Sequence, residues 1–295
     1  MHTTTSLAIV GNVKWVECPR DSWQGYSRFI PTEEKVVYLK GLLEAGFQNL
    51  DLTSFVSPKW VPQHADAEAV LAALPPPEGR EYLAVVGNLR GLERALQAPH
   101  LTSVGYPFSI SETFQRRNLN MGLEDSWRTL REMVAQARGK RFVVYLSMAF
   151  GNPYGDPWSP ALTAQFVQRM RGLEGIAGLA LADTYGVASA QTIGETLEAV
   201  AGLDGGVCDL GLHLHSRPED TLEKVEVALG AGVRWLEGAL GGIGGCPFAG
   251  DERVGNLATE RVLPYLEARG HEVGVALDRL AELAGQAQLL RTKYA

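Results

Sequence analysis

The sequence predicts an α/β fold, a single (β/α)8 barrel with TIM-barrel architecture, and three observations lead to this prediction. Short apolar runs of strand length alternate with amphipathic stretches of helix length along the chain. About eight such strand–helix units can be counted, and this alternation indicates a parallel sheet. The length of 295 residues suits one closed barrel of about 250 residues with a few additional elements. We therefore expect residues 1–295 to form one barrel domain with extra C-terminal helices.

Short apolar runs mark the predicted strands. They are residues 13–18, 49–55, 82–86, 101–104, 142–147, 176–182, 209–215 and 233–236. Their apolar middles are expected to be core. The catalytic groups of a barrel sit at the carboxyl ends of its strands and in the loops that follow, so the polar residues at these ends are the candidates for function.

Helices are predicted where apolar residues recur at helical spacing. The first opens at Pro31, and Thr32 can cap it. Glu33 and Glu34 suit the positive end of its dipole, and the helix stops at Gly46. The other predicted helices are residues 65–74, 89–98, 122–137, 159–171, 190–201, 219–230, 257–269 and 276–289.

Composition excludes several classes of protein. The 27 Lys+Arg and 34 Asp+Glu give a net charge of −7, which argues against nucleic acid as a partner. The three scattered cysteines Cys18, Cys208 and Cys246 cannot form a disulfide framework and fit a reducing compartment. No apolar run approaches the ~20 residues of a membrane span, and residues 1–11 do not look like a signal peptide. We expect a cytoplasmic protein without a membrane partner.

Polar residues at two predicted strand ends, and one in the segment after the last predicted strand, are candidate metal ligands. His213 and His215 stand two residues apart on a strand, so both imidazoles point to one side and can meet one ion. Arg20 and Asp21 follow the first strand. They form either a solvated ion pair, or a carboxylate that ligates metal or acts as a base beside a cation for a developing oxyanion. Asn256 could ligate a metal through its amide oxygen, cap the next helix, or do both.

Two further carboxylates and a thiol are candidate catalytic groups. Asp51 falls in an otherwise apolar strand, so it either pairs with a cation such as Arg20 or lies in solvent. Asp183 is either a general base or metal-side carboxylate, or it caps its loop. Residues 241–245 contain four glycines, the composition of an active-site loop. Cys246 follows them as either a proton donor or thiolate, or an incidental thiol.

Together these segments resemble the 3-hydroxy-3-methylglutaryl-CoA (HMG-CoA) lyases of the DRE-TIM metallolyase superfamily over nearly the whole chain. The most specific stretch is residues 53–63, which read Thr-Ser-Phe-Val-Ser-Pro-Lys-Trp-Val-Pro-Gln. The other lyase-like motifs are Pro19-Arg20-Asp21, Asn88-Leu89-Arg90-Gly91, Asp183-Thr184-Tyr185-Gly186-Val187, His213-Leu214-His215, Gly244-Gly245-Cys246-Pro247 and Gly255-Asn256-Leu257-Ala258-Thr259-Glu260.

The resemblance implies an enzyme that cleaves HMG-CoA, or a related 3-hydroxy acyl-CoA, to acetyl-CoA and acetoacetate or the corresponding keto acid. This retro-Claisen reaction belongs to leucine degradation. The resemblance also implies a homodimer and one Mg²⁺ or Mn²⁺ held by Asp21, His213, His215 and Asn256. A carboxylate, an amide oxygen and two imidazoles suit such an ion.

Other roles follow from the same resemblance. Arg20 would stabilise the thioester enolate, and Cys246 would protonate it. Asp51 would support Arg20, and Asp183 would lie at the rim on the metal side. The expected substrate-pocket residues are Arg20, Tyr145, Ser147 and Thr184, and the cations considered for the CoA phosphates are Lys59, Arg116 and Arg117.

Three positions depart from the lyase pattern. Trp23 stands where the lyases have Leu and is expected to reshape the pocket. Asp51 replaces a longer Glu, and Ser216 replaces an Asp after the second histidine. The Asp51 and Ser216 changes leave open a non-catalytic homologue that binds acyl-CoA. The stretch 251–256 is similar to the condensing synthases of the isopropylmalate and homocitrate type, which are the other alternative.

Overall fold

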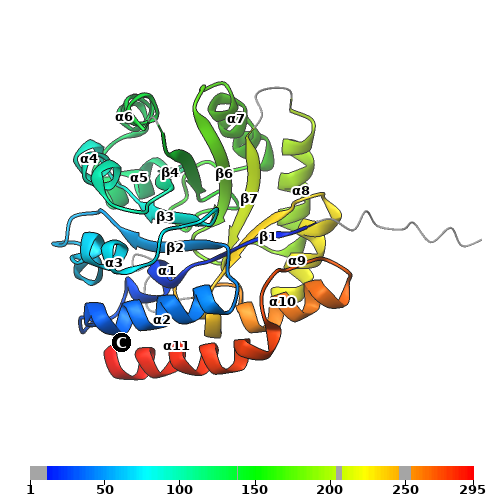
Figure 1. Cartoon of the computed structure of the whole chain (residues 1–295). Helices are drawn as coiled ribbons and strands as arrows, with labels where there is room; N and C mark the ends of the chain where they lie inside the picture. Colours follow the sequence, from blue (N-terminus) through cyan, green and yellow to red (C-terminus); the bar gives the residue numbers. More distant parts are fainter. Residues whose placement is uncertain (1–11, 138, 204–207, 246–253) are drawn as a thin grey trace, which may run out of the picture.

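The computed structural model describes residues 12–137, 139–203, 208–245 and 254–295. Within these residues, eight parallel strands close into a barrel in sequence order, with helices in an outer ring (Figure 1). The (β/α)8 prediction is therefore confirmed. The strands are β1 (Lys14–Glu17), β2 (Asn49–Ser54), β3 (Glu81–Val85), β4 (Ser103–Ser109), β5 (Arg141–Ser147), β6 (Ile176–Asp183), β7 (Asp209–Leu214) and β8 (Trp235–Gly238).

Helices follow the strands as predicted, with two additions. The helices and turns are α1 (Pro19–Trp23), α2 (Thr32–Glu44), η1 (Pro62–His64), α3 (Ala67–Ala73), α4 (Leu89–Gln97), α5 (Glu112–Leu119), α6 (Leu123–Gln136), α7 (Pro160–Arg171), α8 (Ala190–Ala201), α9 (Thr221–Gly230), η2 (Leu240–Gly242), α10 (Thr259–Ala268), η3 (Leu277–Arg279) and α11 (Leu280–Tyr294). The short helix α1 and the polar helix α5 were not predicted. None of the helices in the described part of the chain is long and apolar enough to span a membrane.

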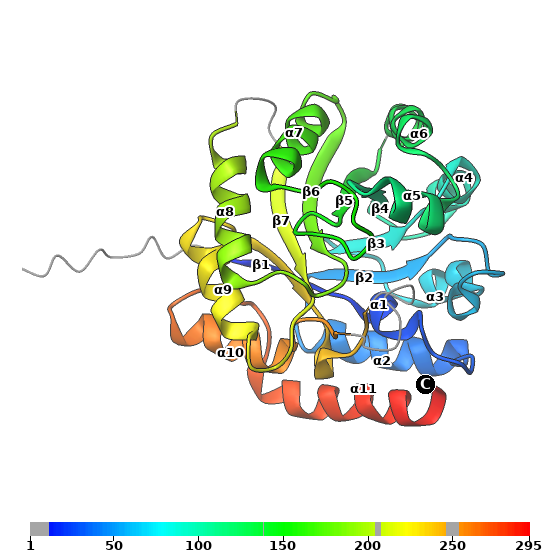
Figure 2. The same cartoon turned by 180° about the vertical axis from the view of Figure 1, so that it is seen from behind.

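The C-terminal helices close the fold on one side. Helix α11 lies alongside α2 in both views (Figures 1 and 2). Its buried Leu283 faces Gly41 of α2, where an added Cβ would stand 3.3 Å from the Leu283 Cδ2. The Tyr294 hydroxyl donates a hydrogen bond of 2.7 Å to Glu34 at the start of α2. The extra C-terminal helices of the prediction are present, and they tie the end of the chain to the first half of the barrel.

Glycines make room for large side chains inside the barrel. A Cβ at Gly211 would lie 2.3 Å from the Trp235 ring, and one at Gly105 would lie 2.7 Å from the Tyr145 ring. These two aromatic residues therefore fill the interior because the neighbouring strands carry no side chain there. They pack with Val16 and other small or branched residues as an inner cluster beneath the carboxyl ends of the strands.

Two local predictions are wrong. Thr32 does not cap α2, because Pro31 holds the cap position and the Thr32 hydroxyl donates instead to Asp66 at 2.8 Å. Strand β4 does not end at Val104 but runs on to Ser109, pairing with β5 throughout. Gly and Pro at positions 105 and 107 have low strand propensity, and pairing with β5 outweighs that local preference.

Candidate active site

The residues predicted as metal ligands meet at the carboxyl ends of the strands. Asp21 lies on α1 directly after β1, and His213 is the second-last residue of β7. His215 follows β7 and forms an isolated β-bridge with Asn256. Ligand atoms of Asp21, His213 and His215 all lie within 4.8 Å of one another. The Asn256 amide Nδ2 donates to Asp21 Oδ2 at 2.8 Å. All four side chains are buried.

The donor atoms of this group fit a divalent cation. Among the described residues, His215 Nε2 and Asn256 Oδ1 are buried without a hydrogen-bond partner. A buried polar atom without a hydrogen-bond partner is costly, so two of them beside Asp21 and His213 fit a ligand site. The amide Nδ2 of Asn256 is occupied by Asp21 and by the Ile243 carbonyl at 2.9 Å. One carboxylate, one amide oxygen and two imidazole nitrogens could therefore hold a borderline or hard divalent ion.

Arg20 and Asp51 form a buried ion pair next to this cluster. Arg20 donates to Asp51 Oδ2 through Nε at 3.0 Å and through Nη2 at 2.5 Å. Its Nη1 donates to Asp21 Oδ1 at 3.1 Å. The shorter Asp51 side chain therefore reaches Arg20, as the pairing interpretation required. Burial raises the pKa of Asp51 to about 6, although the Arg20 charge opposes that rise.

Asp21 is held as an anion by its neighbours. Burial alone would raise its pKa, but His215, Arg20 and His213 outweigh this and hold the pKa well below its usual range. Gln24, which the sequence interpretation did not single out, donates to Asp21 Oδ1 at 2.7 Å. The Arg-Asp-x-x-Gln spacing at the start of α1 was the signal that could have identified it, since residues three and four apart on a helix are neighbours.

Asp183 organises the loop after β6. Its two oxygens accept hydrogen bonds from the backbone N–H groups of Val187 at 2.9 Å and Ala188 at 3.1 Å. Lys224 Nζ lies 3.9 Å from the carboxylate and donates to the His215 carbonyl at 3.0 Å. Burial raises the pKa of Asp183, against the opposing charge of Lys224. These contacts match the loop-capping interpretation. Through Lys224 they also link Asp183 to the candidate ligand His215.

Besides Arg20, the predicted pocket residues are Tyr145, Ser147 and Thr184, which lie at the ends of β5 and β6. The Tyr145 hydroxyl points into the barrel interior and donates to Glu237 at 3.2 Å. The Thr184 hydroxyl accepts a hydrogen bond of 3.1 Å from the Met148 N–H. Ser147 is the last residue of β5 and is buried. Of the three, Tyr145 thus lies beneath the metal-ligand cluster.

Trp23 does not reshape the pocket, contrary to the sequence-based expectation. Its ring is buried and packs edge-on against Tyr38 of α2, with 5.8 Å between the ring centroids. Helical geometry explains the difference, because Asp21 and Trp23 are two apart on α1 and cannot share a face. Cys246, the expected proton donor, lies outside the described residues.

The cations considered for the CoA phosphates lie in loops and helices after β2 and β4. Arg116 pairs with Glu112 on the same helix at 2.6 Å. The Arg117 guanidinium lies 4.7 Å from the centre of the Tyr154 ring. Lys59 follows β2 and is exposed. All three are therefore on the side of the barrel where the candidate ligands meet.

Neither of the hydrogen bonds that Ser216 donates goes to an imidazole. The Ser216 hydroxyl donates to the Arg217 carbonyl at 2.9 Å, and its N–H donates to Gly255. The ring of His215 is oriented instead by the Thr184 carbonyl, which lies 3.2 Å from Nδ1. The loss of an acid at position 216 therefore leaves both rings with other partners.

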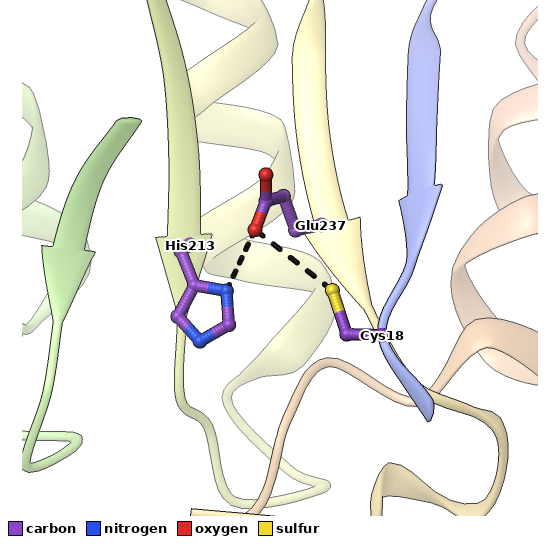
Figure 3. Close-up of side chains that lie close together, drawn as sticks. All are labelled: Cys18, His213 and Glu237. Carbon is purple, nitrogen blue, oxygen red and sulfur yellow. Dashed lines mark hydrogen bonds and ion pairs between the residues drawn. The ribbon is translucent and has the colours of Figure 1, made fainter. Parts of the chain in front are cut away.

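Glu237 is a second site residue, besides Gln24, that sequence reasoning missed. It lies on β8 and is fully buried, and its Oε2 lies 2.8 Å from His213 Nδ1 and 3.8 Å from Cys18 Sγ (Figure 3). The strand was predicted to end at Leu236, so the acid was assigned to a loop. An acid directly after an apolar run was the available signal.

Comparison with known proteins places the chain among HMG-CoA lyases. The model of the HMGL-like family matches residues 12–286. The mitochondrial hydroxymethylglutaryl-CoA lyase of Rattus norvegicus is 36% identical, over 95% of this chain and 86% of its own. The cytoplasmic 3-hydroxy-3-methylglutaryl-CoA lyase of Danio rerio is 34% identical, over 92% of this chain and 80% of its own.

Solved structures agree with these relatives. The HMG-CoA lyase from Brucella melitensis has a TM-score of 0.88 at 33% identity, covering 96% of this chain and 99% of that one. An HMG-CoA lyase from Acinetobacter baumannii in complex with coenzyme A and 3-methylmalate has a TM-score of 0.87 at 30% identity, covering 98% and 93%.

Proposed function

Because this chain belongs to the HMGL-like family, we propose that it is a divalent-metal-dependent carbon–carbon lyase. It cleaves HMG-CoA, or a related 3-hydroxy acyl-CoA, to acetyl-CoA and acetoacetate or the corresponding keto acid. The observation that carries the proposal is the meeting of two imidazoles, a carboxylate and an amide beside the Arg20 guanidinium at one end of the barrel.

The residues proposed to hold the cation are Asp21, His213, His215 and Asn256, which agree in type with Mg²⁺ or Mn²⁺. A divalent cation bound there supplies Lewis-acid polarisation of the substrate oxygens and a template for their orientation. Two possible ligand atoms of the cluster, His215 Nε2 and Asn256 Oδ1, have no hydrogen-bond partner among the described residues. These two atoms are therefore available to a cation, which supports His215 and Asn256 as metal ligands.

The proposed reaction changes the substrate in three ways. A base takes the proton of the substrate C3 hydroxyl, a carbonyl forms at C3 as the C2–C3 bond breaks, and the bonding electrons pass to the thioester as an enolate. Arg20, fixed by Asp51 and Asp21, is proposed to stabilise the charge that develops on the thioester oxygen. Cys246 is proposed to deliver the proton that converts the enolate to acetyl-CoA.

Asp183 and the pocket residues complete the proposed machinery. Asp183 is proposed to act at the rim beside the ligand His215, a role supported by their shared neighbour Lys224. Tyr145, Ser147 and Thr184 are proposed to line the acyl pocket. Lys59, Arg116 and Arg117 are proposed as partners of the CoA phosphates.

Further properties are proposed with this function. The chain is proposed to act in the cytoplasm, in leucine degradation, as a homodimer and as one domain over residues 1–295. A single closed barrel with its C-terminal helices folded against α2 supports the one-domain organisation. A cytoplasmic lyase is among the relatives, as are mitochondrial ones.

The test is product analysis with the chelator-treated protein, with and without Mn²⁺. Metal-dependent formation of acetyl-CoA and acetoacetate from HMG-CoA is the expected result. Release of CoA thiol from acetyl-CoA and a 2-oxo acid would instead identify a condensing synthase. Binding of Mn²⁺ and acyl-CoA without cleavage of any 3-hydroxy-3-alkyl acyl-CoA would identify a non-catalytic homologue.

A further inference from the structure

We propose that Glu237 is a positioning residue, which fixes the tautomer and the orientation of the His213 ring so that this ring can ligate the metal. The proposal rests on the metal site of the proposed function and deepens it. Strands β7 and β8 place the two residues opposite each other, since His213 and Glu237 are register partners. Their side chains meet inside the barrel, with 2.8 Å between Nδ1 and Oε2.

The proton on the His213 ring follows from this contact. An ionised carboxylate can only accept hydrogen bonds, so Nδ1 must carry the proton that it donates to Glu237. In the neutral ring, the lone pair that can bind metal is then on Nε2. Figure 3 shows this second nitrogen pointing away from Glu237. The carboxylate thus selects the one tautomer whose free nitrogen is on the far side of the ring.

Glu237 is itself held in place by other donors. Its Oε1 accepts hydrogen bonds from the Tyr145 hydroxyl at 3.2 Å and the Trp235 Nε1 at 3.1 Å. The Cys18 thiol lies 3.8 Å from Oε2 (Figure 3). These partners are buried and come from strands β5 and β8 and from the end of β1. A buried carboxylate with donors on both oxygens has its charge satisfied and a fixed direction.

The second imidazole ligand provides an internal comparison. His215 Nδ1 also faces an oxygen, but this is the neutral backbone carbonyl of Thr184, at the longer distance of 3.2 Å. Hydrogen bonds to an ionised acceptor are roughly twice as strong as those between neutral groups. Of the two imidazoles, only the His213 ring has its Nδ1 held by a side chain. A substitution at Glu237 can therefore remove this contact, whereas the contact of His215 is with the backbone.

The variant Glu237→Gln is expected to reverse the tautomer. Trp235 Nε1 can only donate, so the amide oxygen of the new side chain must face Trp235 and its NH₂ group must face His213. An NH₂ group donates to Nδ1 and moves the ring proton to Nε2, where it blocks the metal. The matched control is Glu17→Gln, because Glu17 is a buried acid near the end of the neighbouring β1 that contacts Thr259 and Leu240 instead.

Two measurements on the full chain test the proposal. Titration with Mn²⁺ should show about 10- to 100-fold weaker binding to Glu237→Gln than to the parent, and unchanged binding to Glu17→Gln. Nitrogen-15 NMR of the metal-free protein should show His213 as the Nδ1–H tautomer in the parent and in the control, and as the Nε2–H tautomer in Glu237→Gln.

The proposal is overturned if the parent His213 carries its proton on Nε2, a result that does not depend on any variant folding. It is also overturned if a folded Glu237→Gln binds Mn²⁺ as tightly as the parent. The proposed function can fail separately: a parent that shows the Glu237 effect on Mn²⁺ binding but never cleaves HMG-CoA would retain the positioning role and lose the lyase assignment.

Discussion

Glu17 and Glu237 show how the barrel wall gives two buried acids different surroundings. Glu237 faces the interior and the His213 ring, whereas Glu17 faces outward and joins β1 to the elements after β8. The carboxylate oxygens of Glu17 accept hydrogen bonds from the Thr259 hydroxyl at 2.6 Å and the Leu240 N–H at 2.7 Å. Burial nevertheless raises its pKa from the ordinary 4.5 to about 7.

This raised pKa predicts a pH-dependent stability. Glu17 binds its proton more tightly in the folded state, so its contribution to stability is present below pH 4.5 and is lost as pH rises through 7. The free energy of unfolding should therefore fall by up to about 3 kcal/mol from this group between pH 4.5 and 8. Glu17→Gln should remove that part of the slope in denaturant titrations. An identical slope in parent and variant would contradict the assignment.

Cys246 gives a sharper test of catalysis. If it is the proton donor, Cys246→Ser should bind Mn²⁺ and acyl-CoA as the parent does but turn over roughly 10²- to 10⁴-fold more slowly, the range for a lost general acid. Cys208→Ser is the matched control, because Cys208 precedes β7 at the opposite end of the strand from the ligands. Steady-state acetoacetate formation distinguishes the two, and parent-like turnover of Cys246→Ser would exclude the role.

At the scale of elements, local patterns predicted most of the fold. Apolar runs identified every strand because parallel barrel strands are buried on both faces. Strand β4 was cut short because Gly105 and Pro107 break the local pattern, and only pairing with β5 restores it. Helix α5 was missed because its Gln-Arg-Arg-Asn segment has no apolar periodicity.

The candidate site was predictable where one strand or turn supplies the whole signal. His213 and His215 share a face of one strand end, and Arg20 and Asp21 are adjacent, so spacing alone singled them out. Glu237 was different, because its partner lies on another strand. Only the register between β7 and β8 shows that the two residues meet.

Helix α11 leads to a prediction about stability alone. Leu283 is fully buried against α2, whereas Leu289 on the same helix is 70% exposed. Leu283→Ala should therefore lower the free energy of unfolding by about 2–5 kcal/mol, and Leu289→Ala should change it by less than about 0.5 kcal/mol. Denaturant unfolding measures both. Equal effects of the two substitutions would show that α11 does not pack against α2 in solution.

At the scale of the whole molecule, the apolar core that stabilises the barrel and the charged cluster of the candidate site lie in different places. The apolar core lies between the strands and the helical ring, and the charged cluster of Arg20, Asp51 and the candidate ligands sits at the carboxyl ends of the strands. The net charge of −7 does not prevent binding of an anionic thioester, because buried Arg20 and the cations Lys59, Arg116 and Arg117 are local to this end. The metal-ligand cluster is thus assembled only when β1 and β7 close into one barrel.

The most direct test of the account is a Mn²⁺ titration of HMG-CoA cleavage by chelator-treated protein, run beside His215→Ala. The account predicts no cleavage without metal and recovery that saturates at one Mn²⁺ per chain. It also predicts at least about tenfold more Mn²⁺ for half-recovery in the variant. Cleavage that persists in chelator, or recovery at the same Mn²⁺ concentration in His215→Ala, would contradict it.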